Sequence, residues 1–207
     1  MKKLDIIRTY YEANMAKDLP EYGILGWESE EAQRLRFDML LSAVDLEGME
    51  LLDVGCGTGN LLEHIISKGI NVEYTGVDLL DKMIDRAKSK GLAGEFIHAD
   101  IFEDRIFENE SFDVIYTSGI FNLDLGNNID FLKRAIGLFL DLSWQYVVFN
   151  LLHRDSPDRE DKYFYTSPDE VGELLEEYSD RIENVQFIEA YLKNDFTVVI
   201  RKKREAD

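Results

Sequence analysis

From residue 50 onward, apolar and polar positions alternate between strand-like and helix-like patterns. Short apolar runs are separated by segments whose apolar residues recur every three or four positions, which is typical of amphipathic helices. Strands that alternate with helices predict a parallel sheet with helices on both of its faces. The first strands of this sheet are expected at residues 51–54, 74–77, 95–98, 112–117 and 146–150.

The last part of the chain breaks this alternation. Strand-like residues 185–192 and 196–201 are separated only by Lys193, Asn194 and Asp195, which is too short for a crossover helix and suits a hairpin. The final strand is therefore expected to run antiparallel. Just before it, a capping-box pattern that begins at Ser167 predicts a helix over residues 168–178.

Residues 1–45 differ from the rest, with helical stretches at 4–16 and 29–44 around the turn-rich segment "DLPEYGILGWES". We find no internal repeat and no low-complexity linker, so this part is expected to pack over the sheet as an N-terminal helical cap. A chain of 207 residues with 45% hydrophobic content can bury a full core. We expect a single domain spanning residues 1–207.

Charge and composition exclude several classes of partner. The formal net charge is −19, which would repel a polyanion such as nucleic acid. No stretch approaches the roughly 18 apolar residues of a membrane span, and the first residues lack the apolar core of a signal peptide. The single cysteine allows no intrachain disulfide. We expect a cytoplasmic protein with no nucleic-acid or membrane partner, whose oligomeric state the sequence does not indicate.

The stretch "LLDVGCGTGN" places three alternating glycines, Gly55, Gly57 and Gly59, directly after the first strand. Glycine lets the backbone turn sharply and lets a ligand approach it, and the following helix aims free N–H groups back at the loop. A tight turn with close packing would give the same pattern. Two acids support a nucleotide site, because Asp78 and Asp100 follow the second and third strands at the same edge of the sheet.

The spacing of the motif separates two classes of cofactor. A dinucleotide fingerprint has its third glycine one place later, where this chain has Asn60. The acid Asp53 beside the loop suits a ligand with an ammonium group better than a pyrophosphate. The methionine part of S-adenosylmethionine carries such a group.

On these residues the chain resembles the class I S-adenosylmethionine-dependent methyltransferases. "DVGCGTG" matches their first motif, Asp78 their ribose acid, and Asp100 with Ile101 their adenine-side acid. The resemblance covers about residues 45–201 and implies an α/β, doubly wound, seven-stranded mostly parallel sheet with an antiparallel last strand, the Rossmann-like methyltransferase fold. A narrower resemblance, through "LGWESEEAQRLRFDMLL", "SGIFNL" and "VFNLL", is to a group of bacterial methyltransferases of unassigned substrate.

The resemblance implies contacts with S-adenosylmethionine, the expected cofactor. For its carboxylate we choose Arg36, since a guanidinium binds a carboxylate through two hydrogen bonds; Arg34 is the rival, and a surface ion pair is the alternative for either. The other expected contacts are the backbone of Gly55, Gly57 and Gly59 with Asp53 at the methionine part, Asp78 at the ribose, Leu79 and Met83 near the adenine, Asp100 and Ile101 at its edge, and Ser118 near the sulfonium.

Candidates for handling the methyl acceptor lie in the long segment 151–167 and in the cap. A loop of this length is often a lid or a binding loop, and its His153 and Arg154 follow the fifth strand at the expected acceptor position. In the cap, Tyr10 and Tyr11 could exclude water and face the sulfonium. The alternatives are a solvated charged loop and aromatic side chains that only pack the cap onto the sheet.

Methyl transfer is an in-line displacement on a carbon that the cofactor has already activated, so no strong base is required. The chain lacks the N/D-P-P-Y/F pattern of amino-group methylation on nucleic acids and reads "TSGIFN" at that place. We therefore expect a small-molecule acceptor. The scattered histidines predict no metal site. A binding protein of the same fold without turnover, and an NAD-dependent oxidoreductase, remain as alternatives.

Overall fold

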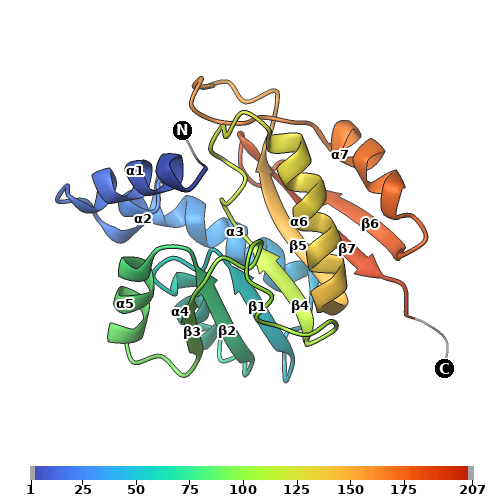
Figure 1. The fold of residues 1–207 in the computed structure, drawn as a ribbon, viewed down its shortest axis with the longest axis horizontal. Coiled ribbons are helices and arrows are strands. Elements are labelled where there is room, and N and C mark those ends of the chain that lie inside the picture. Colours follow the sequence, from blue (N-terminus) through green and yellow to red (C-terminus); the bar gives the residue numbers. More distant parts are fainter. Residues whose placement is uncertain (1–2, 205–207) are drawn as a thin grey trace.

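A single seven-stranded sheet runs through the computed structural model, which describes residues 3–204, and its strand order is β3-β2-β1-β4-β5-β7-β6 (Figure 1). Strands β3, β2, β1, β4 and β5 pair in parallel, whereas β7 runs antiparallel to both of its neighbours. This arrangement confirms the predicted fold class. The strands are β1 Glu50–Val54, β2 Glu73–Asp78, β3 Glu95–His98, β4 Phe112–Thr117, β5 Ser143–Leu152, β6 Ile182–Ile188 and β7 Asp195–Lys202.

Helices cover both faces of the sheet, and each face has its own apolar core. One core packs the buried side chains of α6 and α7, such as Phe139 and Val171, against the strands. The other packs Leu40 of α3, Ile65 of α4 and Ala87 of α5 against the opposite face. The helices are α1 Lys3–Met15, α2 Glu21–Ile24, α3 Glu30–Ala43, α4 Asn60–Ser67, α5 Asp81–Ser89, α6 Asn128–Leu142, α7 Pro168–Leu175 and the 3₁₀ turn η1 Glu176–Tyr178.

The capping residues at the N-termini of the helices act as the sequence predicts. Ser167 accepts a hydrogen bond from the backbone of Glu170, whose side chain bonds back to the Ser167 backbone, so α7 begins with a complete capping box. Ser29 caps α3 by accepting from the backbone N–H of Ala32 at 3.0 Å. The helix expected over residues 168–178 is α7 continued by η1.

Two strands differ from the prediction by more than one residue at their ends. Strand β6 was expected at residues 185–192 but spans Ile182–Ile188, and residues 189–194 form the connection to β7 instead. Ala190 in this connection has a φ of 65°, which no strand residue adopts. Strand β5 is longer than expected, because antiparallel pairing with β7 continues as far as Leu152.

Helices α1 and α2 lie side by side in the cap, and α3 connects them to the sheet (Figure 1). Helix α3 contacts α4 on one side and β7 on the other. The cap therefore packs against an early helix and against the last strand of the chain. Within residues 3–204, no helix has the length and apolar character needed to cross a membrane.

Candidate functional site

The glycine loop between β1 and α4 is built on three residues with positive φ. Gly55, Gly57 and Gly59 have φ of 76°, 55° and 78°, a region that favours glycine. The backbone N–H groups of Gly55 and Cys56 both donate to Val77 O, at 2.7 and 3.1 Å, and hold the loop over the end of β2. The alternating glycines are therefore required by the backbone itself.

Neighbouring side chains of the protein occupy the space that these glycines leave. A Cβ at Gly55 would clash with the side chain of Ile120, and one at Gly57 would lie 2.7 Å from Leu25 of the cap. The sequence predicted that a ligand would approach the bare backbone here. The structure shows that the cap and the loop after β4 also close against it.

A cleft with an empty volume of about 1400 Å³, open to solvent, lies beside this loop at the carboxyl ends of the parallel strands. Ligands of open α/β sheets bind at this edge. Most of the predicted cofactor residues line the cleft, namely Asp53, Gly55, Asp78, Leu79, Met83, Asp100, Ile101 and Ser118.

Asp78 stands at the end of β2 with its carboxylate held by the backbone. Its Oδ2 accepts from the N–H of Gly57 at 2.9 Å, and its Oδ1 accepts from the N–H of Leu80 at 2.9 Å. Burial raises the pKa of Asp78, and these two backbone hydrogen bonds oppose that shift. Each carboxylate oxygen keeps a lone pair for a ligand hydroxyl.

Asp53 is the buried acid of the cleft, with 3% of its surface exposed. The hydroxyl of Tyr74 donates to its Oδ2 at 2.6 Å. Burial raises the pKa of Asp53 to about 7, which the Tyr74 hydrogen bond opposes and the nearby charge of Asp78 increases. A cationic group of a ligand beside Asp53 would stabilise the ionised form.

Asp100 organises the turn that follows β3. Its Oδ1 accepts from the backbone N–H of Phe102 at 3.0 Å, and its carbonyl accepts from the N–H of Asp104 at 2.7 Å. Among the described residues its Oδ2 has no hydrogen-bond partner, so it can accept from a donor such as an adenine amino group. Ile101 and Met83 form apolar parts of the same lining and are themselves almost fully buried.

The cap roofs the cleft with apolar and aromatic side chains. Leu4, Ile7 and Tyr11 of α1 line it, together with Leu25 and Trp27. Burial raises the pKa of Tyr11 far above its ordinary value, and the neighbouring Tyr10 and Asp78 add to this shift. Tyr11 therefore remains a neutral phenol at physiological pH.

A methyltransferase-domain family model matches residues 51–137, from β1 into α6. Rv1506c of Mycobacterium tuberculosis, whose name calls it a methyltransferase, is 28% identical over 158 residues, which are 72% of this chain and 91% of that protein. The malonyl-[acyl-carrier protein] O-methyltransferase of Acetivibrio thermocellus is 26% identical over 133 residues, which cover 59% of this chain and 46% of that protein. Magnesium protoporphyrin IX methyltransferase from Synechocystis PCC 6803 with bound SAH shares the fold, with a TM-score of 0.69 at 12% identity over 98% of this chain and 100% of that one.

The matched domain, these relatives and the shared fold together support a class I S-adenosylmethionine-dependent methyltransferase. Its cofactor is S-adenosylmethionine, and the donor set of the cleft fits that molecule. The charged residues of the lining are four acids and one base, Asp53, Asp78, Asp100, Glu103 and Arg134. This excess of negative charge suits a ligand with a sulfonium and an ammonium group.

The structure does not bring Arg36 of the methyltransferase to the cleft. Its Nε donates to Asp195 Oδ2 at 2.5 Å, and both side chains are buried. Its guanidinium carbon lies 4.2 Å from the centroid of the Trp27 ring. Trp27 lines the cleft, whereas Arg36 does not. The rival Arg34 lies at the surface in an ion pair with Glu30 at 2.6 Å.

The two candidates in the long loop also lie away from the cleft lining. His153 Nε2 is 3.3 Å from Glu189 Oε1, and its Nδ1 accepts from the backbone of Asp155 at 3.0 Å. Arg154 pairs with Glu170 at the start of α7. These contacts hold the loop on the sheet, and a catalytic role for either residue stays a prediction that the geometry does not support.

Tyr10 does not line the cleft, but it joins the cap to the long loop. Its hydroxyl shares a hydrogen bond of 2.9 Å with the hydroxyl of Tyr163. Residues 122–124 pair with the same loop through the backbone of Tyr163 and its neighbours. The loop thus closes on the cap rather than entering the cleft by itself.

Sequence reasoning missed several residues of the lining. Gln33 of α3 and Asn60 of α4 line the cleft, and the amide nitrogen of Asn60 donates to Gln33 Oε1 at 3.1 Å. A single glutamine on a helix has no motif that marks it, whereas Asn60 stands where a dinucleotide fingerprint has its third glycine. The other missed residues include Phe102, Glu103, Phe131 and Arg134. Within residues 3–204, no group of three or more His, Cys, Asp or Glu side chains is arranged to hold a metal ion.

Proposed function

We propose that this methyltransferase transfers the methyl group to a small-molecule acceptor by direct in-line displacement. The observation that carries the proposal is that Leu4, Ile7 and Tyr11 of the cap line the same cleft as Asp53 and Asp78. An acceptor must therefore fit between the cap and the sheet. In this proposal, the cap of residues 1–45 and the sheet work as one domain, because each supplies part of one site.

The cofactor supplies a methyl group on a positively charged sulfur, which is the activated carbon of the reaction. The chain has to position the acceptor and exclude water. Asp78 and Asp100 fix the nucleoside part through their free lone pairs. The apolar roof excludes water, and the rings of Tyr11 and Trp27 provide π faces that suit a cation. None of these roles needs a strong base.

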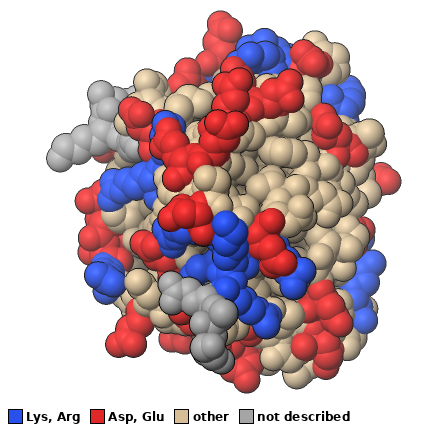
Figure 2. Space-filling model, turned by 90° about the vertical axis from the view of Figure 1, so that its right-hand side faces the viewer, with Lys and Arg blue, Asp and Glu red and all other residues tan. Residues whose placement is uncertain are grey.

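The surface charge supports an acceptor other than nucleic acid. The net charge of −19 repels polyanions. On the face that Figure 2 displays, basic side chains gather in a group below the centre that acidic side chains border, and they do not extend into a basic surface across the whole face. A phosphate backbone would need such a surface to bind.

Two experiments test the proposal. Calorimetry should show about micromolar binding of S-adenosylmethionine and S-adenosylhomocysteine and no comparable binding of NAD. A cell extract is then divided by ultrafiltration, and formation of S-adenosylhomocysteine is followed with each part. Product with the filtrate supports a small-molecule acceptor, whereas product only with the retained part rejects it. Binding without product in either part would favour the non-catalytic alternative.

A further inference from the structure

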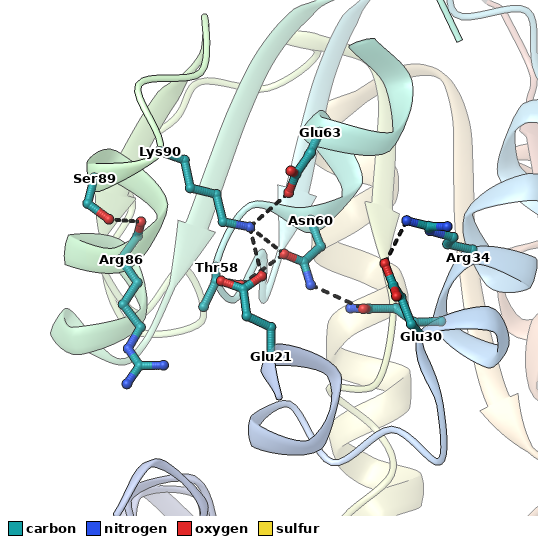
Figure 3. Close-up of polar contacts among 10 residues, drawn as sticks. Glu21, Glu30, Arg34, Thr58, Asn60, Glu63, Arg86, Ser89 and Lys90 are labelled. Atoms are coloured by element: carbon teal, nitrogen blue, oxygen red, sulfur yellow. Dashed lines mark hydrogen bonds and ion pairs between the residues drawn. The ribbon is translucent and has the colours of Figure 1, made fainter. Parts of the chain in front are cut away.

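A line of polar side chains connects the end of helix α5 with the cap (Figure 3). Lys90, which follows α5, places its Nζ 2.6 Å from Asn60 Oδ1. The same Nζ lies 2.9 Å from a carboxylate oxygen of Glu21 in α2 and 3.0 Å from one of Glu63 in α4. Asn60 continues the line, because its Nδ2 donates to Gln33 Oε1 at 3.1 Å.

This line determines which way the two amides face. Lys90 has only donors, so it requires the oxygen of the Asn60 amide, which also accepts from Thr58 Oγ1 at 3.0 Å. The nitrogen of the Asn60 amide is then directed at Gln33 and requires the Gln33 oxygen. Turning either amide over would place donor against donor. The remaining nitrogen of Gln33 is therefore directed away from Asn60.

The Nε2 nitrogen of Gln33 is the one donor in this series of side chains that has no acceptor among the described residues. Gln33 is 5% exposed and lines the cleft. Within residues 3–204, its Nε2 has no hydrogen-bond partner, whereas its Oε1 is bonded to Asn60. This nitrogen is not among the fully buried polar atoms that lack a partner in the described residues, so it keeps contact with solvent, and a ligand in the cleft can supply its acceptor.

We propose that Gln33 Nε2 donates a hydrogen bond to the carboxylate of the methionine part of the cofactor, and that Lys90 positions this donor through Asn60. The inference rests on the proposed function, because it requires the cofactor to occupy the cleft. Asn60 is the first residue of α4, and a helix N-terminus carries partial positive charge that favours an anion.

The cations that could compete for this carboxylate are engaged elsewhere. Arg36 pairs with Asp195, and Arg34 pairs with Glu30. Arg134, the one basic residue among the described lining residues, pairs with Glu103. A neutral amide beside a helix N-terminus is thus the anion site that this side of the cleft offers.

The test compares S-adenosylhomocysteine with its decarboxylated analogue, which keeps the amine and lacks only the carboxylate. Calorimetry on Gln33→Met, a variant of similar size, should show about tenfold weaker binding of S-adenosylhomocysteine and less than about twofold change for the analogue. Gln33→Glu should weaken S-adenosylhomocysteine further, since it sets a carboxylate against a carboxylate. Gln186→Met on the exposed face of β6 is the control and should change neither.

A variant of Lys90 and a control variant of Glu63 test whether Lys90 positions the Gln33 amide. Lys90→Met should weaken S-adenosylhomocysteine about threefold and leave the analogue unchanged. Glu63→Gln removes one ion pair of Lys90 but leaves its contact with Asn60, so it should change neither affinity. Equal losses for both ligands in Gln33→Met, or no loss for either, would overturn the inference while the proposed function stands. Failure of the native protein to bind either ligand would reject both.

Discussion

The backbone N–H of Gly57 donates to Asp78 Oδ2 at 2.9 Å, which joins the glycine loop after β1 to the end of β2. The acid expected to bind the ribose is therefore also part of the structure of the loop. Its two roles can be separated, because one concerns binding of the cofactor and the other the stability of the protein without it.

Changing Asp78→Ala should weaken S-adenosylhomocysteine at least about tenfold, because two hydrogen bonds to a charged acceptor are lost. The variant should also lose about 1 to 3 kcal/mol of unfolding free energy, since the N–H groups of Gly57 and Leu80 lose their acceptor. Calorimetry and urea unfolding measure the two effects. Asp85→Ala, on the exposed side of α5, should change neither, and unchanged affinity in Asp78→Ala would remove the ribose assignment.

Asp53 gives the protein a specific dependence of stability on pH. Its pKa in the folded protein is about 7, above its ordinary value of 3.8, so the folded state holds the proton more tightly than the unfolded state. Its contribution to stability is therefore fully favourable at low pH and is lost as the pH rises from about 4 to about 7.

The change Asp53→Asn removes this ionisation and keeps an oxygen for the Tyr74 hydroxyl. Without cofactor, the variant should be more stable than the native protein by about 1 to 4 kcal/mol at about pH 8, and the difference should shrink toward pH 4. Urea unfolding at a series of pH values measures this difference. A constant difference across the series would show that Asp53 is ionised in the folded state throughout.

The pair of Arg36 and Asp195 joins the cap to the last strand and is almost fully buried. Arg36→Met should lower the free energy of unfolding by about 3 to 5 kcal/mol, because it leaves a buried carboxylate without its cation. Arg34→Met is the matched control, since the exposed pair with Glu30 contributes about 0 to 1 kcal/mol. Adding Asp195→Asn to Arg36→Met should recover part of the loss, and equal losses in the two single variants would contradict this account.

The sequence predicts those parts of the site that depend on local backbone chemistry. The three glycines, Asp78 and the capping box of α7 have fixed positions relative to their own strand or helix, so pattern alone locates them. Residues that depend on distant partners were misplaced. Arg36 was expected at the cofactor, but its partner Asp195 lies 159 positions away in the sequence. No local pattern indicates that pairing.

Gln33 illustrates the same limit, because it lines the cleft and the sequence does not predict it. Its importance comes from burial and from a neighbour on another helix, and neither property has a sequence motif. The end of β6 was misplaced for a related reason. Apolar residues as far as Leu192 continue the strand pattern, but the backbone turns after Ile188 to reach β7.

The hydrogen bond between Tyr10 and Tyr163 connects helix α1, which roofs the cleft, to the loop that follows β5. One such bond stabilises a contact by about 0.5 to 1.5 kcal/mol. If it holds the roof closed over the cofactor, its loss should speed dissociation more than it slows association. Tyr163→Phe should therefore raise the dissociation rate of S-adenosylhomocysteine about two- to tenfold, as stopped-flow fluorescence would measure.

Three further variants decide whether the hydrogen bond itself is responsible. Tyr10→Phe should match Tyr163→Phe, and the double variant should add little, because both changes remove one shared interaction. Tyr165→Phe, in the same loop, removes a hydroxyl that accepts a hydrogen bond from the backbone N–H of Glu160, and it should leave the dissociation rate unchanged. Additive effects of Tyr10→Phe and Tyr163→Phe would show that the two hydroxyls act separately, and the roof would then be held by packing of the α1 side chains alone.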